Sequence, residues 1–442
     1  MTESRRVTII GAGYVGLATA IGLAIRGHRI ELVEIRVDRL DALRAGRLPI
    51  HEPGMDHAFA QPEIRARIHP GPTLVDNSPD VVLICVGTPV QDGGRSDLAQ
   101  VESALGALRE LMGRGVPVVI RSTLPPGSAD TIARWANGDR SRIFASPEFL
   151  RQGKALEDFL HPSRVVVGAF PGADPADLAL VTELLHFDDA PLMVVTVDEA
   201  ELIKNGANAF LALKLSFANE LTALAEELGA DVMPVLEGIG LDARIGRQYM
   251  QPSFGFGGSC LPKELRALAN TGRDHGLEMH VISAAAQANE AHQRRFARRV
   301  LRALPSGSRR VALLGLAFKA DTDDVRYSPA LRVAQLLLDR GVEVVGYDPS
   351  AAANAAQSMP ALQVASSAEA ALAGASIAVI ATEWPEFREL DWATVGETMA
   401  TRMVIDGRRL LDPEKMRSLG YDYQAIGAPQ TVQARRGRLP AG

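Results

Sequence analysis

The feature that most constrains the fold is a glycine turn between a predicted strand and a predicted helix, and this arrangement occurs twice. Residues Arg6–Ile10 form a β-branched run, a glycine-rich turn begins at Gly11, and apolar residues then recur periodically to Ile25. A second strand and turn begin at Arg310, and a helix is predicted over Pro329–Asp339. Strand, turn and helix in this order begin a βαβ unit. The sequence therefore predicts an α/β fold with two Rossmann-like, doubly wound parallel domains.

The region between these two segments has a different, helical pattern that is rich in Ala, Leu, Glu and Lys. One long helix is predicted from about Asp198 to Gly229, and further helix from Pro262 to Leu304. We therefore predict three domains, with a first Rossmann-like domain over 1–198, a helical central domain with a long central helix over 199–304, and a second Rossmann-like domain over 305–442. The long apolar face of this helix either packs on the two neighbouring domains or leaves an exposed remainder that would form a dimer seam, and we predict a homodimer or a higher homo-oligomer.

The first turn has the spacing of a dinucleotide fingerprint. Gly11 permits the tight turn, Gly13 lets a pyrophosphate approach the backbone, and Gly16 lets the helix pack on the strand. Glu34 ends the predicted strand Arg29–Val33, where an acid holds the adenosine ribose hydroxyls. We predict NAD, because Glu34 would repel a 2′-phosphate, while nearby arginines leave NADP as the alternative. The residues concerned are Gly11, Gly13, Tyr14, Val15, Gly16, Glu34, Arg36 and Arg39.

The second turn differs from the first in a way that changes its expected ligand. It reads Gly315-Leu316-Ala317-Phe318-Lys319, with one glycine where the fingerprint needs three. A lysine offers a point charge to a phosphate. The second domain is therefore predicted to bind something other than a dinucleotide, with Lys319 contacting phosphate.

The segment Gly255-Phe256-Gly257-Gly258-Ser259-Cys260 places one of two cysteines directly behind glycines. A thiolate is a strong nucleophile, and a helix beginning near Pro262 would lower the pKa of the Cys260 thiol. The other cysteine, Cys85, lies in an apolar run and is predicted to be buried. Cys260 is therefore the candidate nucleophile, and neither a disulfide nor a metal site is predicted.

Further polar residues are candidates for acid–base chemistry. Lys204 and Asn208 are four residues apart, which places them on one helix face. Asn208 interrupts an apolar run, so it is a candidate for stabilising an oxyanion, although a solvated pair is an equal alternative. Glu148 and Glu264 are candidate bases or ordinary surface acids. Thr123 follows a predicted strand and either holds water or cofactor or caps a turn.

Composition excludes several other classes of function. The net charge of −6 and the isoelectric point of about 5.9 argue against a nucleic-acid partner. The N-terminal residues lack a signal-peptide pattern, and no apolar segment approaches the length of a bilayer span. We therefore expect a cytoplasmic protein without a membrane partner.

Several motifs in this order together resemble those of the UDP-glucose/GDP-mannose dehydrogenase family, and the resemblance covers nearly the whole chain. The matching blocks are Gly11–Leu17, Pro49–Gly54, Cys85–Pro89, Ser146–Leu150, Lys204–Asn208, Gly255–Lys263, Gly315–Lys319, Thr322–Arg326 and Asp406–Arg408. The resemblance implies an NAD-dependent oxidoreductase that oxidises the C6 alcohol of a nucleotide sugar to a carboxylate and uses two NAD in turn. UDP-linked glucose is the favoured substrate. GDP-mannose, another nucleotide hexose, or a catalytically weakened binding protein are the alternatives.

The resemblance also implies a role for each candidate residue. Cys260 would carry a thiohemiacetal and then a thioester, Lys204 and Asn208 would stabilise the oxyanion, and Glu148 would be the base for hydrolysis. Thr123 would help to hold water and cofactor. The other implied cofactor-binding residues are Thr88, Gln152 and Arg326. The implied substrate-binding residues are Phe149, Leu150, Lys204, Asn208, Arg244, Tyr249, Gly257, Phe318, Lys319 and Arg408, with Arg244 reaching the substrate of a neighbouring subunit.

Some positions depart from the family's pattern. Gln152 stands where the family usually has Glu, which removes a charge near the reacting sugar and leaves the base role to Glu148. Glu264 replaces the usual Asp and adds a methylene. Ser259 precedes the cysteine where the acetamido-sugar branch typically has His, and this disfavours that branch. The remaining departures are Arg36, His51 and Tyr327.

Overall fold

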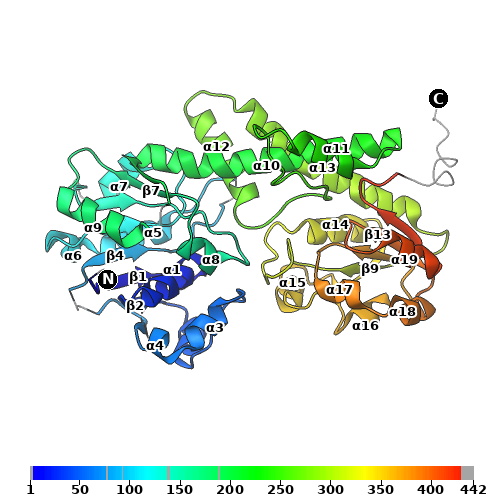
Figure 1. Cartoon of the computed structure of the whole chain (residues 1–442), viewed down its shortest axis with the longest axis horizontal. Coiled ribbons are helices and arrows are strands. Elements are labelled where there is room, and N and C mark those ends of the chain that lie inside the picture. Colours follow the sequence, from blue (N-terminus) through cyan, green and yellow to red (C-terminus); the bar gives the residue numbers. More distant parts are fainter. Residues whose placement is uncertain (1–2, 76–77, 92, 137–139, 188–189, 430–442) are drawn as a thin grey trace. The chain divides into compact units, whose positions relative to one another are not determined.

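The computed structural model describes residues 3–75, 78–91, 93–136, 140–187 and 190–429 (Figure 1). The predicted C-terminal domain continues to residue 442, so its last part, 430–442, lies outside the described range. The chain separates into two compact units. Unit 1 is Met1–Ala207 with Arg266–Glu278, and unit 2 is Asn208–Leu265 with Met279–Gly442.

Unit 1 contains an eight-stranded sheet in the order β3-β2-β1-β4-β5-β6-β7-β8. Apolar side chains from both faces are buried against helices, which is why the strands read as nearly continuous Val, Ile and Leu runs. Two of its strands, β3 and β8, are not predicted from the sequence. The strands are β1 (Arg6–Ile10), β2 (Arg29–Val33), β3 (Ile68–Gly71), β4 (Val81–Ile84), β5 (Val118–Ile120), β6 (Ile143–Ala145), β7 (Val165–Ala169) and β8 (Leu192–Thr196).

The predicted parallel sheet is confirmed except at one pair, because β6 and β7 are antiparallel. The connection from β6 to β7 stays at the carboxyl edge of the sheet, so β7 starts from the edge at which β6 ends. This connection carries Glu148 and therefore leaves it at the edge where cofactors bind in such sheets. The helices of unit 1 are α1 (Tyr14–Ile25), α2 (Val37–Arg44), α3 (Met55–Ala60), α4 (Pro62–Arg65), α5 (Ala99–Ala107), α6 (Arg109–Gly113), α7 (Ala129–Trp135), α8 (Ala155–Leu160) and α9 (Pro175–Leu185).

Unit 2 contains a six-stranded, wholly parallel sheet in the order β11-β10-β9-β12-β13-β14. Two apolar clusters cover its two faces, which confirms a second doubly wound domain. Its strands are β9 (Arg310–Leu314), β10 (Glu343–Tyr347), β11 (Gln363–Val364), β12 (Ile377–Ile380), β13 (Met403–Asp406) and β14 (Asp422–Ala425). Its helices include α14 (Pro329–Leu338), α15 (Ala352–Ser358), α16 (Ala368–Leu372), α17 (Pro385–Glu389), α18 (Trp392–Thr398) and α19 (Pro413–Ser418).

The predicted long central helix is α10, Val197–Leu228, which begins in unit 1 and continues into unit 2. Polar residues lie on one of its faces, and large apolar residues are exposed elsewhere on it. The other helices of the central region are α11 (Val232–Gly240), α12 (Leu261–Asp274) and α13 (His280–Ala303). Within the described ranges, no helix combines the length and the apolar content that crossing a membrane requires.

Candidate active site

The turn after β1 has the packing that the fingerprint predicts. Gly11 has φ +101°, and a Cβ atom there would lie 2.8 Å from the Cys85 carbonyl oxygen. A Cβ atom on Gly16 would lie 1.8 Å from the Gly11 carbonyl oxygen. Gly13 precedes α1 and faces open space, which leaves the amino end of this helix accessible to a phosphate. Cys85 is buried as predicted, and desolvation raises the pKa of its thiol to about 12.

Glu34 lies beside this turn, as an NAD-binding acid would. One carboxylate oxygen accepts the Ala12 N–H at 3.2 Å and the other accepts the Arg36 N–H at 2.8 Å. The Arg36 guanidinium is held by both oxygens of Asp38, at 3.1 and 2.6 Å, and Arg39 lies 3.9 Å from Glu34. Because Asp38 engages Arg36, the carboxylate of Glu34 dominates the site, and these residues fit NAD.

Thr123 lies in the loop that leaves the carboxyl end of β5. The Ser122 hydroxyl donates to the Val86 carbonyl at 2.7 Å, and the Thr88 hydroxyl donates to the Thr123 carbonyl at 3.0 Å. The loop is therefore tied to the segment that follows β4. Thr123 itself is half-buried.

Lys204 and Glu148 are brought together in unit 1. Glu148 follows β6, its Oε2 accepts the Leu150 N–H at 2.5 Å, and its Oε1 lies 3.5 Å from Lys204 Nζ. Lys204 is only 3% exposed, and its Nζ lies 5.3 Å from the centroid of the Phe149 ring. A solvated lysine is thus excluded, and the buried ion pair adjoins the loop that also carries Gln152.

Cys260 and its neighbours belong to unit 2. Cys260 immediately precedes α12, its carbonyl accepts the Glu264 N–H at 2.9 Å, and its Sγ lies 3.6 Å from the Ser259 hydroxyl. Glu264 is 1% exposed, and Asn208 donates to it at 2.5 Å. Glu264 is therefore not a surface acid, and it joins the Cys260 turn to the polar face of α10.

The glycines before Cys260 pack closely on the segment after β9. A Cβ atom on Gly257 would lie 2.2 Å from the Tyr327 carbonyl oxygen, and one on Gly258 would lie 2.9 Å from the Phe318 ring. Gly258 has φ +85°, and its N–H donates to the Arg326 carbonyl at 3.0 Å. The cysteine turn and the predicted phosphate-binding turn are thus in contact within unit 2.

Arg408, which follows β13, supports the same turn. Its Nε donates to the Ala381 carbonyl at 2.8 Å, and its Nη2 donates to the Phe318 carbonyl at 3.2 Å. Its guanidinium also lies 5.2 Å from the centroid of the Phe254 ring. Lys319 is half-buried, with its Nζ 5.8 Å from the centroid of the Phe318 ring. Arg408, Phe318 and Lys319 therefore form one cluster in unit 2, and their predicted contact with the nucleotide sugar stays a prediction.

Three predicted residues are less closely tied to these clusters. The Arg244 side chain is 88% exposed and makes a bidentate pair with Asp242. Arg326 makes a bidentate pair with Asp324, at 2.9 and 2.6 Å. Tyr249 is half-buried and has a positive φ of 60°. Their predicted contacts with substrate or cofactor stay predictions.

Sequence reasoning missed the polar residues that hold the cysteine segment in unit 2. The Asn289 side chain donates to the Phe256 carbonyl at 3.0 Å and accepts the Phe256 N–H at 2.9 Å. His292 Nε2 lies 2.7 Å from the Ser253 carbonyl, so this nitrogen carries a proton, and burial lowers the pKa of the imidazole. Both residues lie on α13, where their only sequence signal is a polar residue on a buried helix face.

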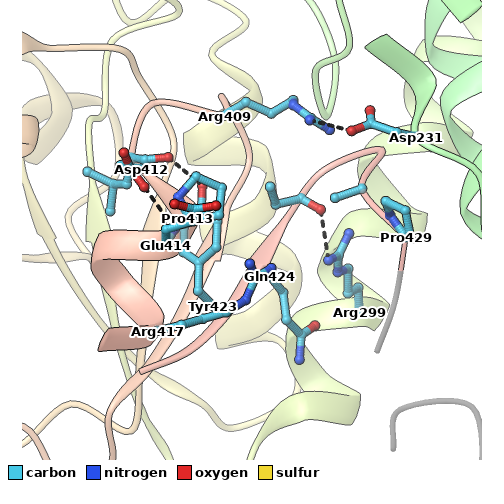
Figure 2. A pocket seen from close by; sticks show the side chains of 13 residues that line it. Asp231, Arg299, Arg409, Asp412, Pro413, Glu414, Arg417, Tyr423, Gln424 and Pro429 are labelled. Carbon is cyan, nitrogen blue, oxygen red and sulfur yellow. Dashed lines mark hydrogen bonds and ion pairs between the residues drawn. The ribbon is translucent and has the colours of Figure 1, made fainter. Parts of the chain in front are cut away.

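A pocket of about 670 Å³ in unit 2 lies apart from these predicted residues (Figure 2). Its described lining includes Asp231, Arg299, Arg409 and Arg417, and none of the predicted site residues. Arg409 donates to Asp231 at 3.0 Å (Figure 2). Arg299 lies 2.8 Å from Glu226. Arg409 and Arg299, two of the basic residues that line this pocket, therefore already face carboxylates.

Comparison with family models matches three successive parts of the chain to one family, the UDP-glucose/GDP-mannose dehydrogenase family. Its NAD binding domain matches residues 5–186, its central domain matches 198–291, and its UDP binding domain matches 312–413. The first of these matches confirms NAD as the cofactor.

Individual relatives agree with the family models. The chain is 38% identical to a UDP-glucose 6-dehydrogenase of Rhizobium meliloti (strain 1021) over 436 residues, which are 96% of this chain and 100% of that protein. It superposes on a UDP-glucose dehydrogenase of Pyrobaculum islandicum with a TM-score of 0.86 at 36% identity, covering 96% and 98% of the two chains. A UDP-D-ManNAc dehydrogenase of Pyrococcus horikoshii gives a TM-score of 0.82 at 28% identity, covering 96% and 99%. The chain therefore belongs to the UDP-glucose/GDP-mannose dehydrogenase family.

Proposed function

We propose that this protein oxidises the C6 alcohol of UDP-glucose to the carboxylate of UDP-glucuronate in two successive steps at Cys260. NAD supplies the hydride acceptor in each oxidation. The observation that carries the proposal is the polar face of α10, on which Lys204 pairs with Glu148 and Asn208, one turn later, binds Glu264. Glu264 in turn lies one helical turn after Cys260. Each residue type that the chemistry needs is thus tied to one helix.

In the first oxidation, the C6 hydroxyl releases its proton to water and C6 gives up a hydride, which leaves an aldehyde. The ammonium of Lys204 and the amide of Asn208 stabilise the negative charge that develops on the oxygen. The Cys260 thiolate then forms a C–S bond with the aldehyde carbon, and the oxygen takes up a proton, giving a thiohemiacetal.

The second oxidation removes a hydride from the thiohemiacetal carbon, and the proton of its oxygen is released to water, giving a thioester. Glu148 then accepts a proton from water as the water attacks the carbonyl carbon, and the half-buried Thr123 helps to hold this water. The C–S bond breaks, the thiolate leaves, and the acid is released. Two NAD are reduced and one water is consumed for each sugar.

The UDP binding domain of the family and the UDP-glucose dehydrogenases among the relatives support UDP-glucose as the substrate. Phe318, Lys319 and Arg408 would bind the nucleotide, with Phe149, Leu150, Tyr249 and Gly257 against the remainder. GDP-mannose is the second candidate, because the family includes GDP-mannose dehydrogenases. A panel of nucleotide sugars with NAD and with NADP, scored for reduced cofactor and for uronic acid, separates these substrates.

The stoichiometry tests the mechanism directly. We expect two NADH for each sugar oxidised, whereas one NADH would indicate a simple alcohol oxidation and none would indicate a binding protein. Cys260→Ala should abolish acid formation and leave the binding of NAD and of the nucleotide sugar within about twofold of the wild type. Full turnover by this variant would exclude the covalent route.

We also propose that the protein acts in the cytoplasm as a homodimer formed through α10. Phe210 is 62% exposed, and Phe217 and Leu224 follow it at seven-residue intervals on the same face. Exposed apolar stripes of this kind mark association surfaces. In such a dimer, the exposed Arg244 would reach the neighbouring subunit's substrate. The double variant Phe210→Glu/Phe217→Glu should sediment as a monomer.

We retain the division into domains at 1–198, 199–304 and 305–442 as part of this proposal.

A further inference from the structure

Two residues that flank Lys204 on α10 bind the loop that carries Thr123. Asn205 follows Lys204 directly, and its side-chain amide donates to the Leu124 carbonyl at 2.9 Å. Glu201 lies one turn earlier, and its Oε2 accepts the Ser128 N–H at 3.2 Å. The two side chains thus hold the loop at two points that are four residues apart.

The other contacts of this loop leave its backbone little freedom. Before Thr123, the Ser122 hydroxyl donates to the Val86 carbonyl, and the Thr88 hydroxyl donates to the Thr123 carbonyl. After Thr123, the Ser128 hydroxyl donates to the Pro125 carbonyl at 2.6 Å. The loop is therefore fixed to the end of β4 on one side and to α10 on the other.

Helix stability alone does not account for these two polar residues. Glu201 is 3% exposed and Asn205 is 1% exposed. Within the described residues, Glu201 Oε1 and Asn205 Oδ1 are buried without a hydrogen-bond partner. Desolvation raises the pKa of the Glu201 carboxyl well above its ordinary value. Burying polar oxygens in this way is costly, and apolar side chains at both positions would pack on α10 without that cost.

We propose that Glu201 and Asn205 are positioning residues that clamp the Thr123 loop to the helical turn carrying Lys204. The clamp fixes the separation between the Thr123 hydroxyl and the Lys204 ammonium, two groups that act on the same reacting centre in the proposed function. The inference therefore rests on that function. Displacements of about 1 Å in such a site lower rates by up to about a hundredfold.

The contacts demand a donor at position 205 and an acceptor at position 201, so two isosteric substitutions should have opposite outcomes. Asn205→Asp removes the N–H group that reaches the Leu124 carbonyl. Glu201→Gln keeps an oxygen for the Ser128 N–H. We expect Asn205→Asp to lower kcat by about tenfold to a hundredfold, and Glu201→Gln to keep kcat within about twofold of the wild type. Glu201→Leu should lower kcat as Asn205→Asp does.

The readouts are kcat and KM with UDP-glucose and NAD, the Tm, and hydrogen exchange of the backbone N–H groups of Ser122–Leu124, Gly127 and Ser128. The clamp predicts faster exchange in this loop and a fall in kcat with little change in KM for NAD. Leu202→Ala, on an exposed position of the same helix, is the matched control and should change none of these. A role in folding alone would lower the Tm of the clamp variants and leave kcat of the folded protein unchanged, and that result would overturn the inference.

The wild type in the same series separates this inference from the function on which it rests. If the wild type reduces no NAD with any nucleotide sugar, the proposed function fails. If it turns over normally and both Asn205→Asp and Glu201→Leu keep its kcat and its loop exchange, the clamp fails while the function stands. Equal effects of the two isosteric variants would also contradict the clamp, because losing the donor at position 205 would then matter no more than keeping the acceptor at position 201.

Discussion

The turns after β1 and after β9 occupy equivalent places in their two sheets. The acidic residues beside these two turns differ, however, in their burial and in their hydrogen bonds. Gly11 and Gly315 have nearly the same positive φ, 101° and 98°, and each donates its N–H to the end of the next strand, at Val33 and at Tyr347. An acid then follows that strand in both units, Glu34 in the first and Asp348 in the second.

The carboxylate of Asp348 is fully occupied by hydrogen bonds from the protein itself. It is 1% exposed, and its two oxygens accept hydrogen bonds from four backbone N–H groups and from an indole N–H. A ribose hydroxyl therefore has no place at Asp348. Glu34 accepts two backbone N–H groups and adjoins the open space at Gly13. The same fold thus uses Asp348 to brace a turn and leaves Glu34 beside the turn at which we predict that NAD binds. The donors to Asp348 are Leu316, Ala317, Ser350, Ala351 and Trp384.

The largest expected effect comes from adding one methyl group to each turn. In Gly16→Ala, the new Cβ would lie 1.8 Å from the Gly11 carbonyl oxygen, so α1 must move away from the turn. We expect NAD affinity, measured by calorimetry, to fall about a hundredfold or more. In Gly315→Ala, the Cβ would meet the Thr382 hydroxyl at 1.9 Å, which should lower the Tm and leave NAD affinity of the folded protein unchanged. Loss of NAD binding in the second variant would contradict the comparison.

The next effect separates the two acids. Asp348→Asn replaces a carboxylate that faces only donors, so we expect it to lower the free energy of unfolding by about 2 to 4 kcal/mol. Glu34→Gln should lower NAD affinity about tenfold and change stability less than Asp348→Asn does. Urea denaturation and NAD titration of both variants provide the measurements. Equal losses of stability would mean that Glu34 is also a bracing residue.

The sequence was sufficient to distinguish the two turns, because their difference in glycines and in Lys319 is local. Three glycines in one turn and one glycine with Lys319 in the other are properties of consecutive residues, as is the four-residue spacing of Lys204 and Asn208. Contacts between distant segments could not be predicted in this way. The antiparallel β7 depends on the edge at which a connection returns, and the binding of the Thr123 loop by Asn205 joins residues 81 positions apart.

A smaller effect tests the ligand of the second turn. Lys319→Met keeps most of the side-chain volume and removes the charge beside Phe318. We expect the KM for the nucleotide sugar to rise about tenfold and the KM for NAD to stay unchanged. Steady-state kinetics with each substrate varied in turn measures both constants. A rise in the KM for NAD alone would mean that the second turn binds NAD, which would contradict the comparison.

The smallest effect concerns the choice between NAD and NADP at the first turn. Asp38 holds the Arg36 guanidinium, and both side chains are exposed. Asp38→Ala would free Arg36 for a 2′-phosphate, but an exposed ion pair contributes little, so the preference should shift toward NADP by at most about fivefold. Glu34 remains in place and still repels the phosphate, which keeps NAD the better cofactor. The ratio of kcat/KM for the two cofactors measures the shift, with Arg36→Ala in the same background as the control. If the double variant kept the shift, Arg36 would have no part in it, and the loss of the Asp38 charge itself would account for it.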